Sequence, residues 1–403
     1  MFNRSEKTIL ALMSLVHFCL IVDFMVVMPQ GPQLMRALEI SAQQFGFLVS
    51  SYTLGAGLMS LLASFWIDRF DRKTALLASF FAFALCNWVC SWVNTYSAFW
   101  VARLLTGAMG GIVGTLLFSV VSDAIDIDRR ASALGIVMSA FALASIVGVP
   151  LCLWISHLWG WHASFYFLTG VSVLVGATVA KILPAIPSHL KVEKQDFQQS
   201  MRLFAALITH PSRILALLFV CFLILGHFSV IPFLFPSVVS NALMSEKQLP
   251  VIYIVGGFAS ILSSILFGKA ADRFGKKKVF TFALLGSLPA IYMATHLTPV
   301  PLPHVVFVVS SFFIWMGGRL TPAMAIVTAT ALPQNRASFL SLIGSVQQLS
   351  AALAAFLAGL MVTKTDAGAL VGFQNVGYMA VGFSLLALAI SKKIQFVEGG
   401  NTK

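Results

Sequence analysis

The sequence contains few charged residues for its length. Asp, Glu, Lys and Arg make up 10% of its 403 residues, against roughly 25% in an ordinary soluble domain. Hydrophobic residues make up 59%, which is more apolar surface than one water-soluble core of this size can bury. The composition therefore excludes an ordinary soluble protein and predicts an integral membrane protein surrounded by lipid.

Cysteine is scarce, and signs of catalysis are missing. All five cysteines fall in apolar runs, and Cys86 and Cys90 stand one helical turn apart. No second pair and no histidine completes a metal site with them. The sequence also lacks a paired-carboxylate motif, a nucleophile with its base and a phosphate-binding loop. We therefore expect no cofactor and no enzymatic activity.

Long apolar runs, in contrast, are abundant. A helix needs about 20 residues to cross a hydrocarbon core of roughly 30 Å. By that measure the sequence predicts twelve membrane spans, at 8–30, 44–67, 74–94, 97–122, 131–156, 162–184, 213–236, 248–271, 278–297, 303–330, 336–362 and 369–391.

The basic residues are distributed unevenly between the loops. Of the 26 Lys and Arg, Arg36, Lys247 and Lys364 fall on one side, Arg103 and Arg319 lie inside spans, and the other 21 fall on the opposite side. Because cytoplasmic loops carry the positive excess, we expect both termini and the longest loop in the cytoplasm. The net charge of +12 then reflects orientation in the bilayer rather than binding to nucleic acid.

The two halves of the chain repeat each other. Asp23-Phe24 recurs as His227-Phe228, and Asp68-Arg69-Phe70 recurs as Asp272-Arg273-Phe274, each at an offset of 204. Repeats in the same orientation predict two bundles related by an axis along the membrane normal, with a central site between them. The expected parts are a first bundle at 1–184, a cytoplasmic linker at 185–212 and a second bundle at 213–403.

The repeated loops resemble a family signature. They read Asp68-Arg69-Phe70-Asp71-Arg72-Lys73 and Gly268-Lys269-Ala270-Ala271-Asp272-Arg273-Phe274-Gly275-Lys276-Lys277. The pattern is similar to G-x-x-x-D-R-x-G-R-R of the major facilitator superfamily, although Ser64 and Asp71 stand where the first copy should have glycine. The resemblance implies an all-α integral membrane fold of twelve transmembrane helices in two pseudo-symmetric six-helix bundles. It also implies a multi-pass monomer in the bacterial inner membrane.

The same resemblance implies a cytoplasmic latch of charged residues. A carboxylate beside neighbouring helix ends can pair with cations in one state and release them in another. The expected latch residues are Asp68, Arg69, Arg72, Asp123, Asp126, Asp272, Arg273 and Arg336. The alternative is that these charges only orient the chain in the membrane.

Asp23 and Arg103 are the expected proton-coupling residues. A titratable side chain inside a span costs several kcal/mol unless it is paired or wetted. At 1.5 Å per residue, both lie about 20 Å from the cytoplasmic edge of the membrane, and Arg103-x-x-x-Gly107 resembles a family element associated with proton handling. The arginine favours the charged carboxylate, and its departure favours protonation. The alternative is a static salt bridge. Proton exchange requires a water path to Asp23, and a carboxylate sealed from both faces of the membrane would rule out the proposed mechanism.

Further polar residues within the spans are candidate substrate contacts. His227 corresponds to Asp23 in the second half and could contact substrate or proton, or be a packing residue. Arg319 lies about 22 Å from the outer edge, too far from the Asp23 layer for a direct pair. Gln347 and Gln348 could supply neutral hydrogen bonds. Together with Asp23 and Arg103, these are the expected substrate-binding residues.

The fifth span favours export. Its series Gly135, Ala144, Gly148 and Pro150 resembles, in a degenerate form, the antiporter signature of drug and of sugar and metabolite exporters. The leading hypothesis is therefore a proton-coupled antiporter that exports a small organic solute by alternating access. The alternative is a proton-coupled symporter. Since two intramembrane arginines face one acid, it would import an anionic metabolite such as an organic acid or a carboxylate siderophore.

A transporter-derived sensor is a third possibility. It would bind a solute without moving it, and it would be expected to carry a long soluble extension for output. The sequence after Leu385 is short, so the pattern favours a transporter.

Overall fold

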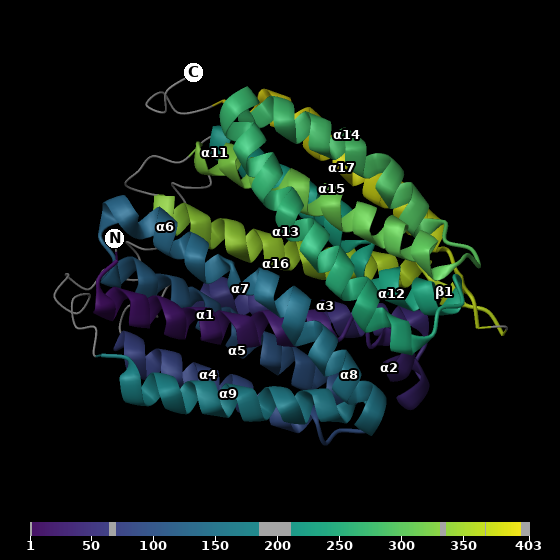
Figure 1. Ribbon diagram of the computed structural model, residues 1–403, viewed down its shortest axis with the longest axis horizontal. Helices are drawn as coiled ribbons and strands as arrows, with labels where there is room; N and C mark the ends of the chain where they lie inside the picture. The colour runs from purple at the N-terminus through teal and green to yellow at the C-terminus, as the bar shows by residue number, and fades with distance from the viewer. Residues whose placement is uncertain (1, 64–69, 185–210, 331–335, 367, 396–403) are drawn as a thin grey trace. The chain divides into compact units, whose positions relative to one another are not determined.

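The structure is a computed structural model that describes residues 2–63, 70–184, 211–330, 336–366 and 368–395. Nearly all of the described chain is helical (Figure 1). In chain order the elements are α1 (Arg4–Val26), α2 (Gly31–Ala37), α3 (Ala42–Ala63), α4 (Arg72–Cys90), α5 (Tyr96–Ala124), α6 (Ile127–Met138), α7 (Ala140–Leu143), the π-helix η2 (Ala144–Gly148), α8 (Val149–Trp159), α9 (His162–Ile182), α11 (Pro211–Phe228), α12 (Ile231–Ser240), the 3₁₀ turn η4 (Glu246–Gln248), α13 (Leu249–Phe274), α14 (Lys276–Thr295), α15 (Leu302–Thr328), α16 (Arg336–Met361), β1 (Thr363–Lys364), β2 (Leu370–Val371) and α17 (Phe373–Lys393).

The described residues contain twelve helical segments that are long and apolar enough to cross a membrane. They coincide with the twelve predicted spans, with ends that differ by a few residues. The expected all-α integral membrane fold is therefore confirmed.

The chain divides into two compact units. The first contains the described residues of 1–27 and 51–201, and the second contains those of 28–50 and 202–403. The expected division differs for 28–50, which pack with the second unit, so the boundary falls inside α3. Of the expected linker at 185–212, residues 185–210 lie outside the described residues.

Corresponding helices make corresponding contacts in the two units. In the first unit α4 packs on α5 and α9, and in the second unit α14 packs on α15 and α17 (Figure 1). Likewise α1 packs on α9, as α11 packs on α17. The internal repeat seen in the sequence is thus also a repeat of helix packing.

Helical spacing explains why Asp23 faces inward. On α1 the buried side chains Met13, Val16, Leu20 and Asp23 recur every three or four residues, so they share one face of the helix. This face joins the apolar core of the first unit, where Val113, Leu116 and other residues of α5 are also buried. Asp23 is therefore carried into the interior of the unit by the same spacing that buries its apolar neighbours.

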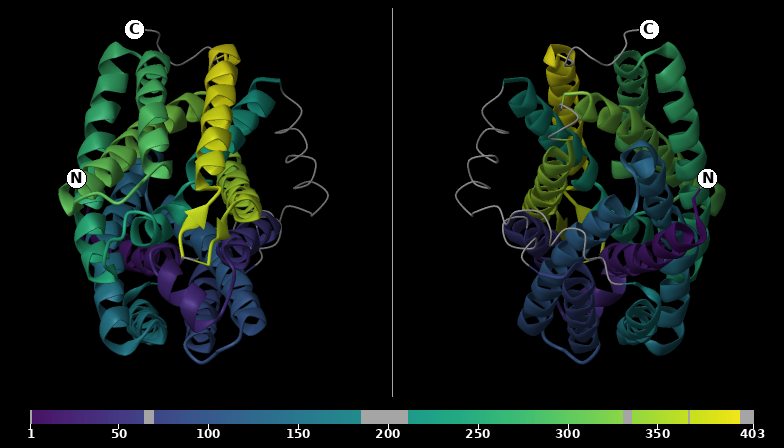
Figure 2. Two further views of the ribbon diagram at one scale, coloured as in Figure 1. Left: turned by 90° about the vertical axis from the view of Figure 1, so that its right-hand side faces the viewer. Right: turned by 90° about the vertical axis from the view of Figure 1, so that its left-hand side faces the viewer.

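Two predicted spans are interrupted. The fifth consists of α6, α7, η2 and α8, with a π-helical turn at Ala144–Gly148; such turns commonly kink a helix. The seventh is divided into α11 and α12, since Ser229 and Val230 lie between them and Pro232 lies in the first turn of α12. An antiparallel pair of short strands, β1 and β2, each of two residues, precedes α17 (Figure 2).

The two copies of the repeated loop differ in backbone conformation. Gly275 caps α14 with φ of 94°, a region that glycine enters at little cost. Asp71 occupies the corresponding place before α4 with φ of −59°, so no glycine is needed there. Its side chain instead accepts a hydrogen bond from the Thr74 backbone N–H at 2.8 Å, which caps the helix. At this departure from the family pattern, a side-chain cap by Asp71 thus takes the place of a glycine with positive φ at the start of the helix.

Candidate functional site

Asp23 and Arg103 form a buried ion pair in the first unit. Arg103 Nη1 donates to Asp23 Oδ1 at 2.6 Å, and Nη2 donates to the Asp23 backbone oxygen at 3.2 Å. Asp23 is 0% and Arg103 1% exposed. The second carboxylate oxygen, Oδ2, has no hydrogen-bond partner among the described residues. One oxygen of the carboxylate is therefore held by the cation, while the other remains able to take a proton.

Aromatic rings hold the guanidinium from other helices. The ring centroid of Tyr52 on α3 lies 4.6 Å from Arg103 Cζ, and that of Phe165 on α9 lies 5.8 Å away. Cation–π contacts in a desolvated site contribute about 2 kcal/mol or more. Arg103 therefore keeps favourable contacts even when protonation of Asp23 removes the opposite charge.

A glycine seam lets α3 approach α5 at this site. A Cβ added to Gly107 would lie 2.0 Å from the Tyr52 backbone oxygen, and one added to Gly111 would lie 2.3 Å from the Ala56 oxygen. From α3, a Cβ on Gly55 would lie 2.2 Å from the Leu104 oxygen. Small residues at such crossings allow backbones to come close, and this closeness brings the Tyr52 ring onto Arg103.

Gly107→Ala is expected to push α3 away and to disturb the ion pair. The new methyl group would meet backbone rather than a flexible side chain, and overpacking of this kind costs about 1–3 kcal/mol. We expect a lower unfolding temperature of the purified protein and reduced transport. Gly114→Ala on the same helix is the matched control, because a Cβ there meets nothing within 4 Å. Equal effects of the two substitutions would contradict the close approach.

The carboxylate is sealed from solvent in this conformation. Since Asp23 is 0% exposed, the water path that exchange requires does not reach it here. This conformation therefore lacks the water path on which the proton-coupling prediction depends. The prediction requires a second conformation in which water reaches Oδ2.

His227 and Arg319 lie in the interior of the second unit. His227, on α11, is partly exposed, but its Nδ1 is buried and has no partner among the described residues. Arg319, on α15, is 0% exposed and donates from Nη1 to the hydroxyls of Ser287 at 3.1 Å and Ser384 at 2.9 Å. Among the described residues, it forms no ion pair.

The two glutamines on α16 are partly exposed. Gln347 Nε2 lies 3.5 Å from the sulfur of Met324. Within the described part of the second unit, Gln348 forms no hydrogen bond with His227 or Arg319. They remain candidates on the strength of their position alone.

Of the expected latch residues, the structure brings Arg72 and Asp123 together. Arg72 Nε lies 3.1 Å from Asp123 Oδ2. Asp126 pairs with Arg129 instead of Arg72. Asp272 and Arg273 are exposed, and the Arg273 guanidinium lies over the Phe274 ring at 5.3 Å. Asp68 and Arg69 fall outside the described residues, as does the side chain of Arg336.

Sequence reasoning missed an ion pair between α1 and α6. Arg129 Nη1 and Nη2 each donate to a different oxygen of Glu6 at 2.9 Å. The hydrogen bonds that Arg129 donates to Asp126 and Glu6 raise the pKa of its guanidinium. Glu6 also closes a capping box with Asn3 at the start of α1. The Asn3 to Glu6 spacing signals the cap, but no spacing signals the pairing with Arg129.

A second missed feature is a pair of equivalent lysines. Lys73 Nζ donates to the backbone oxygen of Leu183, just past α9, at 2.5 Å. Lys277 Nζ donates to that of Ile394, just past α17, at 2.6 Å. Lysine favours the C-terminal end of a helix, where carbonyls lack partners. The offset of 204 between the two lysines was a usable signal.

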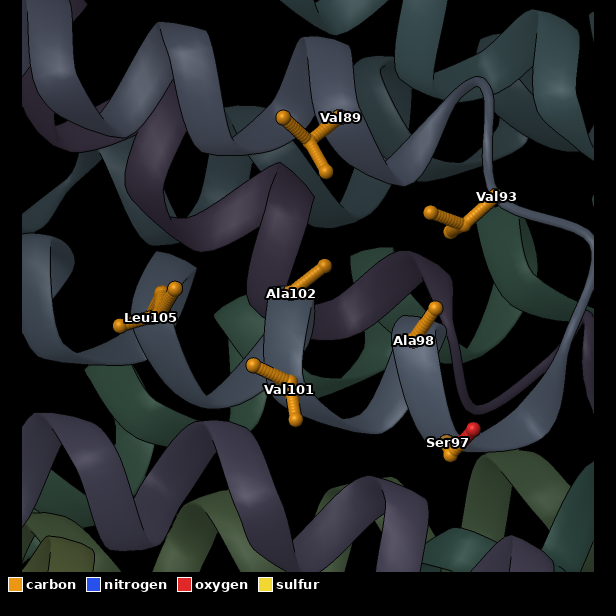
Figure 3. Close-up of a pocket in the computed structure, with 7 residues that line it drawn as sticks. All are labelled: Val89, Val93, Ser97, Ala98, Val101, Ala102 and Leu105. Carbon is orange, nitrogen blue, oxygen red and sulfur yellow. The ribbon is translucent and has the colours of Figure 1, made fainter.

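A shallow apolar groove lies between the end of α4 and the start of α5 (Figure 3). Its volume is about 440 Å³, and it is lined by Val89, Val93, Ser97, Ala98, Val101, Ala102 and Leu105. Val101 and Leu105 are each 49% exposed, whereas Arg103, about 200° around the helix from Val101, points inward. With one hydroxyl as its only polar side-chain group, the groove offers little to orient a polar solute.

Comparison with known proteins agrees with this architecture. An uncharacterised MFS-type transporter of Bacillus subtilis is 22% identical over 364 residues, covering 90% of this chain and 91% of the relative. Multidrug resistance protein 2 of the same organism is 22% identical and covers 72% of this chain and 74% of the relative. A probable sugar efflux transporter of Helicobacter acinonychis is 25% identical and covers 64% of each chain.

Solved structures share the fold. The crystal structure of a D-xylose-proton symporter has a TM-score of 0.77 at 16% identity and covers 98% of this chain and 99% of its own. An inward-facing bacterial homologue of the lysosomal transporter Spinster has a TM-score of 0.75 at 16% identity and covers 99% and 100%.

The family model of the Major Facilitator Superfamily matches residues 13–261 and 217–397, which together include both units and both buried arginines. Because these matches extend along nearly the whole chain and agree with its twelve spans and its repeated packing, this protein is a multi-pass membrane transporter that belongs to the Major Facilitator Superfamily.

Proposed function

We propose that this protein is a proton-coupled secondary transporter that exports a small organic solute by alternating access. The observation that carries the proposal is the buried pair of Asp23 and Arg103, whose Oδ2 atom has no partner among the described residues. An ionisable residue inside a membrane protein is by default a functional site. Protonation of Asp23 changes the net charge of this buried site by one, which gives the proton a direct means to bias the conformation.

Two further observations support export. Two of the relatives are named as a multidrug resistance protein and a probable sugar efflux transporter. The fifth span also contains the degenerate exporter pattern, and its Gly148 packs directly on α1. A Cβ added there would lie 2.2 Å from Val22 Cγ2. The part of the fifth span that carries the exporter pattern therefore contacts the turn of α1 that carries Asp23.

The alternative is a proton-coupled symporter for an anionic metabolite. It is favoured by Arg319, a buried cation with no acidic partner among the described residues. In either mode we propose Asp23 and Arg103 as the proton-coupling pair, with His227, Arg319, Gln347 and Gln348 as substrate contacts. We propose that both termini lie in the cytoplasm. We also propose that the charged residues at the cytoplasmic helix ends form the latch: Asp68, Arg69, Arg72, Asp123, Asp126, Asp272, Arg273 and Arg336.

The function can be tested by identifying the solute and then measuring its coupling. Metabolite profiling of cells that lack or overproduce the protein would reveal a solute whose distribution depends on it. The purified protein would then be reconstituted into liposomes with an imposed pH gradient. An exporter should move the labelled solute against the proton flow, whereas a symporter should move it with the proton. Movement that ignores the gradient would contradict proton coupling.

Arg103→Lys is expected to reduce proton-driven transport by about tenfold or more. Lysine keeps the charge, but it loses the planar fork that binds Asp23 Oδ1 and the Asp23 backbone oxygen together. A hydrogen bond to a charged group contributes about 1.5–3 kcal/mol, and each 1.4 kcal/mol changes a rate about tenfold. Arg36→Lys, at a side chain that is 57% exposed beside Glu246, should leave transport unchanged. Wild-type activity of Arg103→Lys would argue for a pairing without geometric demand.

A further inference from the structure

Arg319 is a fully buried cation whose only hydrogen-bond partners among the described residues are neutral. Its Nη1 atom is bound by the Ser287 and Ser384 hydroxyls. Each hydroxyl already donates its own proton to a backbone carbonyl, at 2.6 Å for Ser287 and 2.8 Å for Ser384. The serines therefore only accept from Arg319. They orient the guanidinium but leave its positive charge without an opposite charge.

No carboxylate of the second unit is placed to balance this charge. The acids among its described residues are Glu39, Glu246, Asp272 and Asp366, at helix ends or in connections. Glu246 is paired with Arg36 at 2.6 Å. Arginine does not lose its proton in proteins, and a buried charge without a partner costs several kcal/mol. Within the described part of the second unit Arg319 therefore has no counter-ion, and an anion bound there would balance its charge.

The unpartnered atoms of Arg319 have a defined geometry. Nε and Nη2 form no hydrogen bond within the described part of the chain. These two nitrogens lie on the same side of the planar guanidinium, and their N–H groups form a fork that matches the two oxygens of a carboxylate. Nη1 is turned toward the serines, so the fork that remains is the one suited to a bidentate partner.

His227 brings a further polar atom from a different helix. Its buried Nδ1 has no partner among the described residues. The preceding residue, Gly226, lies against α17, where an added Cβ would be 2.7 Å from Ser384 Oγ. The glycine therefore lets α11, which carries His227, approach the helix that carries one of the two serines bound to Arg319.

We propose that Arg319, through Nε and Nη2, binds a carboxylate group of the transported solute, which makes the substrate class organic carboxylates. This inference rests on the proposed function, because it assumes that a solute is transported. It goes further by assigning the solute's charged group and the atoms that recognise it. The carboxylate supplies the opposite charge that the second unit itself does not provide.

Binding to the purified full-length protein in lipid nanodiscs tests the proposal without any transport. The probes are acetate and benzoate, with acetamide and benzamide as neutral matches and chloride as an inorganic anion, in a buffer otherwise low in anions. The readouts are the unfolding temperature and the heat of binding. We expect at least one of the two carboxylates to bind and to raise the unfolding temperature, while the amides and chloride have no effect.

Two substitutions locate the binding. Arg319→Met should weaken carboxylate affinity at least tenfold, and Arg319→Lys, which keeps the charge with a single donor group, should bind with intermediate affinity. Arg36→Met, at an arginine of the same unit whose side chain is 57% exposed, should bind carboxylate as the wild type does. The proposal is overturned if neither carboxylate binds, if Arg319→Met binds unchanged, or if chloride or the amides replace the carboxylate equally well.

The same data separate this inference from the proposed function. Carboxylate binding that depends on Arg319, in a protein whose transport ignores the pH gradient, would retain the anion site and reject proton coupling. Proton-coupled transport by a protein whose carboxylate binding is unchanged in Arg319→Met would reject the anion site alone.

Discussion

Asp23→Asn is expected to abolish solute movement driven by a pH gradient while the protein stays folded. Asparagine has nearly the same shape, and its oxygen can still accept the hydrogen bond that Arg103 Nη1 now donates to Oδ1 at 2.6 Å. It cannot gain or lose a proton, so the pH gradient loses its point of action. The measurement is uptake of labelled solute into proteoliposomes with and without an imposed gradient.

Counterflow at equal pH on both sides supplies the internal comparison. Exchange of labelled for unlabelled solute needs no net proton movement, so Asp23→Asn should keep a measurable counterflow. Asp366→Asn, at an exposed acid in the second unit, should behave as the wild type in both assays. Gradient-driven transport that persists in Asp23→Asn would move the coupling role to another residue.

Arg103→Met should lower the free energy of unfolding by about 3–5 kcal/mol. That is the typical loss when one member of a buried pair is removed and the other is left without a partner. Here both side chains are almost fully buried, at 0% and 1% exposed, so solvent offers little compensation. Unfolding in detergent micelles, followed by helix content and by temperature, gives the comparison with the wild type.

Two matched variants show whether the loss comes from the stranded carboxylate. Adding Asp23→Asn to Arg103→Met should restore part of the stability, because the pair couples in a double-mutant cycle. Arg319→Met should cost much less than Arg103→Met, since it removes a charge whose partners Ser287 and Ser384 keep their own backbone hydrogen bonds. An equal loss in both methionine variants would mean that packing volume, rather than charge, decides the effect.

Most of the fold was predictable because a bilayer imposes one simple rule. Backbone polar groups must be satisfied inside each spanning segment, so every long apolar run becomes a helix of nearly fixed length. The runs at 97–122 and 303–330, for example, correspond to α5 (Tyr96–Ala124) and α15 (Leu302–Thr328). The interruptions were not predictable from hydropathy. The π-helical turn at Ala144–Gly148 depends on local packing that an apolar count does not record.

The site was predictable to the extent that it depends on depth. Equal depth, together with the resemblance of Arg103-x-x-x-Gly107 to a family element, suggested that Asp23 and Arg103 could meet, and the structure brings them together. Tyr52 was not identified because an aromatic residue in an apolar run is unremarkable until the glycine seam places it on the arginine. The serines around Arg319 were missed for a similar reason. A single hydroxyl is common in membrane helices. Only the packing of three helices in the structure shows that two serine hydroxyls contact the same arginine.

Lys73 and Lys277 help each bundle to keep its helices packed together during conformational change. Each reaches from the start of one helix to the carbonyl end of the last described helix in its unit, α9 for Lys73 and α17 for Lys277. This hydrogen bond joins two helices of the bundle at one end, so the last of them stays attached when the inner helices tilt. Both lysines belong to the repeated loop. The segment that carries the family signature therefore also fastens the first and last of these helices together in its own bundle.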